Sequence, residues 1–226
     1  MPQAIIFDKD GTLFGFTQTW APWCVDLMRD LGRDDVHARA LSDAVGFDLD
    51  TGTYAPDSPV IAGTPDQSAD LMLPLLPDWH RADLIAHMIE RPVTPVPATD
   101  LLTVLEALKT RNIPMAIMTN DSAAAADEQL AALDLAHYFD AIVGYDSGHG
   151  MKPDAAPLLA CARLMNVPAQ SCMMVGDSPH DINAGRAAGM RTLGVLTGVA
   201  NAASLSAADA VIADIGLLPD WLDTQT

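Results

Sequence analysis

The sequence predicts an α/β protein in which helices cover both faces of a parallel β-sheet and a mostly helical domain is inserted near the start. Two observations lead to this fold class. Short apolar runs alternate with stretches of helical length, and such spacing is typical of a parallel sheet. In addition, the interval from about residue 15 to about residue 92 shows helical patterns but no convincing strand.

Six apolar runs are the predicted strands of the sheet. A strand that is covered on both faces is expected to be a continuous apolar run rather than an alternating one. The runs lie at residues 4–7, 114–118, 141–143, 172–175, 192–196 and, with a weaker pattern, 210–212. Helix-length stretches separate most of them, at residues 99–111, 122–133, 154–165 and 180–188.

The insertion contains helical patterns around residues 19–31, 34–47, 65–75 and 79–89. The chain enters it through residues 11–17 and leaves it through a stretch punctuated by Pro92, Pro95 and Pro97. Prolines at this density favour turns and extended backbone over helix. We therefore predict a core domain of residues 1–14 and 95–226 and a helical cap domain of residues 15–94.

The charge of the chain limits its partners. It carries 12 basic and 30 acidic residues, a formal net charge of -18, and no cluster of Lys or Arg interrupts the acidic background. Nucleic acids and anionic membrane surfaces attract basic patches, so we expect neither as a partner. The acidic excess by itself is read as a solubility feature.

The three cysteines, Cys24, Cys161 and Cys172, show no CxxC spacing. An odd number of widely separated cysteines favours packed thiols in a reducing compartment over a disulfide framework or a zinc site. No basic segment followed by an apolar one resembles a secretion signal, and no apolar stretch reaches the length of a membrane span. We expect a cytoplasmic protein.

Polar residues with complementary chemistry follow four of the predicted strands. Two aspartates follow the first strand, a hydroxyl and an amide the second, a lysine the third, and two more aspartates the fourth. These residues are Asp8 and Asp10, Thr119 and Asn120, Lys152, and Asp177 and Asp181. Because the carboxyl ends of parallel strands carry the chemistry of such sheets, we expect all of them at one site.

The carboxylates and the other groups favour different ligands. Four neighbouring carboxylates repel one another unless a cation joins them, and their oxygens suit Mg²⁺. On an extended backbone Asp8 and Asp10 would point the same way, so both are expected beside the ion. Thr119, Asn120 and Lys152, together with the N–H groups of a helix N-terminus, suit a phosphate. A metal ion, an oxyanion site and a free carboxylate indicate phosphoryl transfer.

Four sequence motifs, "FDKDGTLF", "IMTN", "KPD" and "MVGDSPHDINAGRAAGM", together resemble the haloacid dehalogenase superfamily in its phosphatase branch. The run from Lys152 onward is similar to the phosphoglycolate phosphatase-like group. The resemblance covers residues 1–14 and about 95–215. It implies a Rossmann-like core with a helical cap inserted after the first motif, in agreement with the interruption of the strand pattern.

The resemblance also implies a role for each site residue. Asp8 would be the nucleophile that becomes an aspartyl-phosphate, and Asp10 would protonate the leaving group, activate water and offer its backbone carbonyl to magnesium. Thr119 and Lys152 would bind the transferring phosphoryl group. Asp177 would be the main acidic ligand of the metal from the fourth motif, and Asp181 would bind the ion directly or through a water molecule. His149 and His180 lie inside the motifs without a role there, so we expect solvated side chains.

The expected activity is that of a magnesium-dependent phosphatase acting on a small phosphorylated metabolite. Two alternatives stay open: a phosphosugar mutase of the same fold, and a signalling receiver module, which also combines a phosphorylatable Asp, a Thr and a Lys around magnesium. Many relatives carry an acidic residue and a Ser or Thr after the first motif, where this chain has Phe14, Gly15 and Phe16. The substrate is therefore left open, and the sequence does not indicate the oligomeric state.

Overall fold

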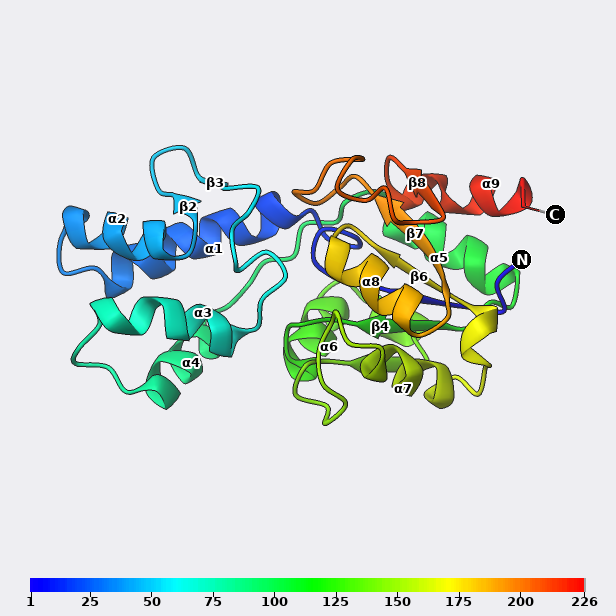
Figure 1. Ribbon diagram of the computed structural model, residues 1–226, viewed down its shortest axis with the longest axis horizontal. Coiled ribbons are helices and arrows are strands. Elements are labelled where there is room, and N and C mark those ends of the chain that lie inside the picture. Colours follow the sequence, from blue (N-terminus) through cyan, green and yellow to red (C-terminus); the bar gives the residue numbers. More distant parts are fainter. Residues whose placement is uncertain (226) are drawn as a thin grey trace. The chain divides into compact units, whose positions relative to one another are not determined.

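The computed structural model describes residues 1–225, and the chain forms two compact units (Figure 1). The first comprises Met1–Phe16 together with the chain from Pro95 onward, and the second, Thr17–Thr94, interrupts it after the first strand. A role of the second unit as a cap over an active site stays a prediction. Within the described residues, each helix is too short or too polar to cross a membrane.

A six-stranded parallel sheet forms the centre of the first unit. In spatial order its strands are β5 (Ala141–Val143), β4 (Met115–Met118), β1 (Ala4–Phe7), β6 (Cys172–Gly176), β7 (Arg191–Val195) and β8 (Ala210–Ile212). The two central strands are β1 and β6, and in β1 Ile5 lies opposite both Met115 and Met173. The chain adds β4 and β5 on one side of β1 and then crosses to the other side. Ligands of such sheets bind beyond the carboxyl ends of the strands at this reversal.

Helices cover both faces of this sheet because its strands are apolar on both sides (Figure 1). In β1, Ile5 and Phe7 belong to one hydrophobic cluster, whereas Ala4 and Ile6 belong to the other, as the alternation of side chains along a strand requires. The first cluster includes residues of α5 (Leu101–Thr110), α6 (Ala123–Ala131) and α9 (Leu218–Asp223), and the second includes residues of α7 (Ala156–Leu164) and α8 (Pro179–Ala187). The three layers confirm the predicted fold class.

Helices α5 and α6 begin at polar side chains that cap their N-termini. Asp100 accepts a hydrogen bond from the backbone N–H of Thr103 at the start of α5, and Ser122 accepts one from Ala125 at the start of α6. The loops after β4 and β6, which carry Thr119, Asn120 and Asp177, are short, whereas Lys152 lies in the longer loop between β5 and α7.

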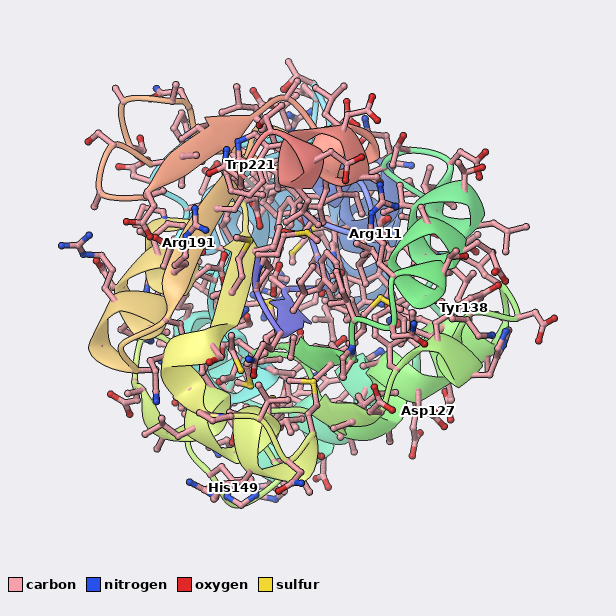
Figure 2. All side chains as sticks on the ribbon, turned by 90° about the vertical axis from the view of Figure 1, so that its right-hand side faces the viewer. Arg111, Asp127, Tyr138, His149, Arg191 and Trp221 are labelled. Carbon is pink, nitrogen blue, oxygen red and sulfur yellow. The ribbon has the colours of Figure 1, made fainter. Side chains whose placement is uncertain are left out.

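The short helix α9 is absent from the predicted elements. It packs on the first unit through buried Leu218 and Leu222. Two cations anchor it: Arg111 donates a hydrogen bond to Asp223 at 2.9 Å, and the Arg191 guanidinium lies 5.7 Å from the centre of the Trp221 ring (Figure 2). Its six residues are too few to show a helical period in the sequence.

The second unit is mostly helical, as predicted, and has its own hydrophobic cluster. Its helices are α1 (Phe16–Leu31), α2 (Asp35–Ala44), α3 (Pro65–Met72), continued by the 3-10 turn η1 (Leu73–Leu75), and α4 (Arg81–Glu90). The prediction that this interval lacks strands is wrong, because β2 (Phe47–Asp48) and β3 (Thr53–Tyr54) form an antiparallel ribbon. The helix predicted to reach residue 47 ends at Ala44, before Gly46, whose φ of +65° favours glycine.

Candidate active site

Three buried carboxylates meet at the carboxyl ends of the two central strands. Asp8 directly follows β1, where its N–H donates to the carbonyl of Val175, and Asp177 directly follows β6. Asp181 lies in the first turn of α8. One oxygen from each of the three carboxylates lies within 4.8 Å of the others. The structure therefore brings together three of the four aspartates predicted to surround a cation.

Lys152 supplies a positive charge to this cluster. Its Nζ lies 2.5 Å from Oδ1 of Asp8 and 2.7 Å from Oδ1 of Asp181, and its side chain is buried. Burial opposes the charged lysine, but the two neighbouring carboxylates outweigh it and raise the pKa of Lys152. One ammonium thus faces three carboxylates, counting Asp177.

Burial and the excess of negative charge raise the pKa values of two of the carboxylates, those of Asp8 and Asp177. Burial raises the pKa of Asp8 to about 7; Lys152 opposes this shift, whereas Asp181 and Asp10 add to it. Burial, reinforced by Asp8 and Asp181, also raises the pKa of Asp177 well above its ordinary range. A hard divalent cation would offset this surplus, and three carboxylate oxygens are ligands that suit one. The residues present therefore fit a divalent metal.

Asp181 is held by the start of its own helix. Its N–H donates to the Ser178 hydroxyl, and its Oδ2 accepts from the N–H and the hydroxyl of Ser178 at 2.9 and 2.7 Å. This reciprocal capping box fixes one oxygen of the carboxylate. The other oxygen, Oδ1, faces Lys152. The sequence "GDSPHD" thus builds a helix start and a site residue from the same side chain.

Asp177 is enclosed by two glycines. A Cβ on Gly11 would lie 2.3 Å from Oδ2 of Asp177, and a Cβ on Gly198 would lie 1.7 Å from the same atom. Gly11 also has a φ of +91°, which side-chain-bearing residues rarely adopt. The hydroxyl of Thr12 donates to Oδ1 of Asp177 at 3.4 Å, and the hydroxyl of Thr197 donates to the carbonyl of Gly11 at 2.6 Å. Close backbone approach on both sides therefore sets the position of this carboxylate.

Thr119 and Asn120 follow β4, as predicted, but they make different contacts. The N–H of Thr119 donates to the carbonyl of Val143, and its buried hydroxyl oxygen accepts from the N–H of Asp121. The Asn120 amide pairs with the backbone of Lys152 in both directions, at 2.9 and 3.0 Å. Asn120 thus ties the lysine loop to the end of β4. A direct contact of either residue with phosphate stays a prediction.

The carboxylate of Asp10 pairs with a different lysine from that of Asp8. The chain bends at Lys9, whose carbonyl accepts from the N–H groups of Leu13 and Phe14, so the backbone beyond Phe7 is not extended. Oδ2 of Asp10 lies 2.7 Å from Nζ of Lys9, a fully buried lysine to which the sequence motifs assigned no role. The inference that both aspartates share one face of a strand does not hold in this loop. A metal contact from the Asp10 carbonyl stays a prediction.

The two histidines inside the motifs lie at the surface. His180 is exposed in the first turn of α8, and His149 is exposed at the periphery of the molecule (Figure 2). Both positions agree with the expectation of solvated side chains.

Comparison with known proteins identifies the family. Residues 5–195 match the haloacid dehalogenase-like hydrolase family. The chain belongs to this family. A phosphoglycolate phosphatase of Neisseria meningitidis is 32% identical, over 96% of this chain and 91% of that protein. A phosphoglycolate phosphatase of Chromobacterium violaceum is 30% identical, over 97% and 96% of the two chains.

Solved structures of the same fold lie at lower sequence identity. A hydrolase from Pseudomonas syringae superposes with a TM-score of 0.69 at 22% identity, covering 99% of both chains. A β-phosphoglucomutase from Clostridium difficile superposes with a TM-score of 0.65 at 20% identity, covering 99% of this chain and 96% of that one. These likenesses show the fold alone. The predicted enzyme class is confirmed: the protein is a hydrolase of this family, and both relatives described above are phosphatases.

Proposed function

We propose that this hydrolase is a magnesium-dependent phosphatase that cleaves a small phosphate monoester through an aspartyl-phosphate on Asp8. The observation that supports this proposal most directly is the buried cluster of Asp8, Asp177 and Asp181, in which Lys152 forms ion pairs with Asp8 and Asp181. Burying three carboxylates is costly unless positive charge offsets theirs. Lys152 and a magnesium ion would supply that charge, and such an ion also binds phosphate oxygens.

The residues divide the reaction into two displacements at phosphorus. A carboxylate oxygen of Asp8 forms a bond to phosphorus while the bond to the ester oxygen breaks, and Asp10 gives that oxygen its proton. Water then attacks the phosphorus of the aspartyl-phosphate, Asp10 takes up a proton from it, and the bond to the Asp8 oxygen breaks. Phosphate leaves and both aspartates return to their initial states.

The other side chains stabilise charge during these steps. Lys152, held beside Asp8, would neutralise part of the charge on the phosphoryl oxygens, and the Thr119 hydroxyl would donate to one of them. The carboxylates of Asp8, Asp177 and Asp181, with the carbonyl of Asp10, would hold the magnesium ion. When bound, the ion supplies positive charge to the phosphoryl group and favours the ionised, nucleophilic form of Asp8.

The substrate proposal rests on the curated relatives. Phosphoglycolate phosphatases that are 30% and 32% identical over most of this chain favour phosphoglycolate or a similar small acid phosphate. The mutase alternative draws only on a likeness of fold at 20% identity, and the membership of a hydrolase family disfavours a receiver module. The free, buried thiols of Cys24, Cys161 and Cys172 support a reducing, cytoplasmic location.

The mechanism predicts different behaviour for the two aspartates of the first loop. Asp8→Asn removes the nucleophile and should abolish turnover of every substrate. Asp10→Asn should still release p-nitrophenol, whose anion departs without a proton, but should react poorly with an alkyl phosphate. Because this variant lacks the base for hydrolysis, its aspartyl-phosphate should accumulate.

Rapid-quench kinetics and intact-mass measurement test this difference. A burst of about one p-nitrophenol per Asp10→Asn enzyme, with phosphate retained on the protein, is the expected result. Equal losses on both substrates, with no phosphorylated protein, would remove Asp10 from the acid–base role. In the same series, release of inorganic phosphate from phosphoglycolate separates a phosphatase from a mutase.

A further inference from the structure

Lys9, which stands between Asp8 and Asp10 in the sequence, is fully buried. Three oxygen atoms surround its ammonium: Oδ2 of Asp10 at 2.7 Å, Oδ2 of Asp121 at 3.1 Å and Oε1 of Gln129 at 2.6 Å. An ammonium carries three N–H donors, so it can donate one hydrogen bond to each of these three oxygens. The ring of Phe14, with its centre 6.0 Å away, lies on a further side.

The acceptors come from two different segments. Asp10 belongs to the loop after β1, whereas Asp121 and Gln129 belong to the loop after β4 and to the α6 helix that follows it. Asp121 is itself held in place, since its Oδ1 accepts from the N–H of Ser122 at 2.7 Å. Lys9 therefore links Asp10 to a helix whose own start is fixed by hydrogen bonds.

A buried lysine is an unfavourable choice for simple packing. Desolvating an ammonium costs several kcal/mol, and an apolar side chain of similar volume would fill this space without that cost. Unlike an apolar side chain, the ammonium forms ion pairs with Asp10 and Asp121 and donates a hydrogen bond to Gln129. Of these three partners, Asp10 is the one with a proposed role in the reaction, and the ion pair with Lys9 holds one oxygen of its carboxylate.

We propose that Lys9, braced by Asp121 and Gln129, is a positioning residue that orients the carboxylate of Asp10 toward the leaving group. This inference rests on the proposed role of Asp10 as general acid. Proton donation depends on hydrogen-bond reach to the leaving oxygen, so a carboxylate free to rotate loses part of this contribution. Lys9 itself would not touch the substrate.

The test compares kcat/KM for p-nitrophenyl phosphate and for an alkyl phosphate, with magnesium present. This ratio reports the steps up to departure of the leaving group and is insensitive to the later hydrolysis. Lys9→Met should lower kcat/KM for the alkyl phosphate by roughly 10- to 100-fold, a part of what general acid catalysis contributes. For p-nitrophenyl phosphate, kcat/KM should stay within about threefold, because that leaving group needs little protonation.

Three further variants separate positioning from folding. Lys109→Met removes an exposed lysine of α5 and should leave kcat/KM for both substrates unchanged. Lys9→Met/Asp121→Leu removes Lys9 together with the carboxylate of Asp121, so no carboxylate is left unpaired at position 121, while Asp10 still loses its ion pair with Lys9. It should keep the selective loss on the alkyl phosphate. Gln129→Met changes no charge and should show a smaller loss of the same kind, which gives the result if the Lys9 variants do not fold.

The outcomes distinguish this inference from the proposed function. Asp10→Asn, measured alongside, should show the largest selective loss on the alkyl phosphate. Suppose that Asp10→Asn shows that loss, but folded Lys9 or Gln129 variants lower kcat/KM for both substrates equally or not at all. The positioning role of Lys9 is then refuted, while the phosphatase mechanism stands. If Asp10→Asn itself lowers kcat/KM for both substrates equally, the proposed role of Asp10 as general acid is refuted.

Discussion

Replacing Gly198 with alanine tests the geometry around Asp177 with a single methyl group. The new Cβ would lie 1.7 Å from Oδ2, 2.4 Å from Cγ and 2.8 Å from Cβ of Asp177. Ordinary van der Waals contact begins near 3.4 Å, so the carboxylate would have to move by roughly the difference of 1.7 Å. Movement away from Gly198 is restricted, because Gly11 lies against the same oxygen.

A shift of this size is large for a metal ligand. Ligand distances are typically held to within about 0.2 Å, so the displaced carboxylate cannot keep its contact. We expect the apparent magnesium affinity to fall by about 10- to 100-fold, the range found when groups that orient metal ligands are removed. Crowding in the buried site should also lower the free energy of unfolding by about 1–3 kcal/mol.

Magnesium titrations of activity and of thermal stability measure the two effects. Gly189→Ala is the matched control: Gly189 has a φ of +72°, and an added Cβ would meet no atom within 4 Å. Backbone strain should lower its stability by about 1 kcal/mol while its half-saturating magnesium concentration stays unchanged. A Gly198→Ala enzyme that folds and has the parent's magnesium affinity would refute the reasoning, because the added methyl group would then not displace the carboxylate of Asp177.

Three further predictions concern charge in the same site. Lys152→Met should lower kcat by about 10²- to 10³-fold, whereas the exposed His180→Ala should stay within a few-fold of the parent; similar losses in a steady-state assay would contradict this division. Excess EDTA should abolish hydrolysis of p-nitrophenyl phosphate, and Mg²⁺ but not Ca²⁺ should restore it, because the larger ion does not keep the octahedral geometry. Without metal, the free energy of unfolding should fall as pH rises from about 4 to about 7, by up to about 4 kcal/mol. The reason is that burial raises the pKa of Asp8 from 3.8 to about 7 in the folded state, so its protonated form stabilises the fold in acid and this contribution is lost as pH rises. Denaturant titrations across this range should show a smaller fall in Asp8→Asn; an equal fall would refute the assignment.

The amino-acid sequence alone was enough to predict the sheet and the residues at its carboxyl edge. Apolar runs and helix caps are local features, and the geometry of parallel strands places the residues after each strand on one edge. This is why the positions of Asp8, Thr119 and Asp177 after their strands could be predicted from spacing alone. The weaker predictions lay where local patterns are short, as in the ribbon of β2 and β3.

The pairing of side chains within that edge depends instead on tertiary structure. The contact of Lys9 with Gln129 spans 120 residues, and that of Lys152 with Asp8 spans 144. Such pairings depend on how each loop bends after its strand, and the bend at Lys9 sends Asp10 to a partner that an extended chain would not give it. The periodicity of a strand does not extend into the loop after it. The exact positions of the side chains in the site are therefore set by hydrogen bonds within the loops and by the close approach of Gly11 and Gly198 to Asp177.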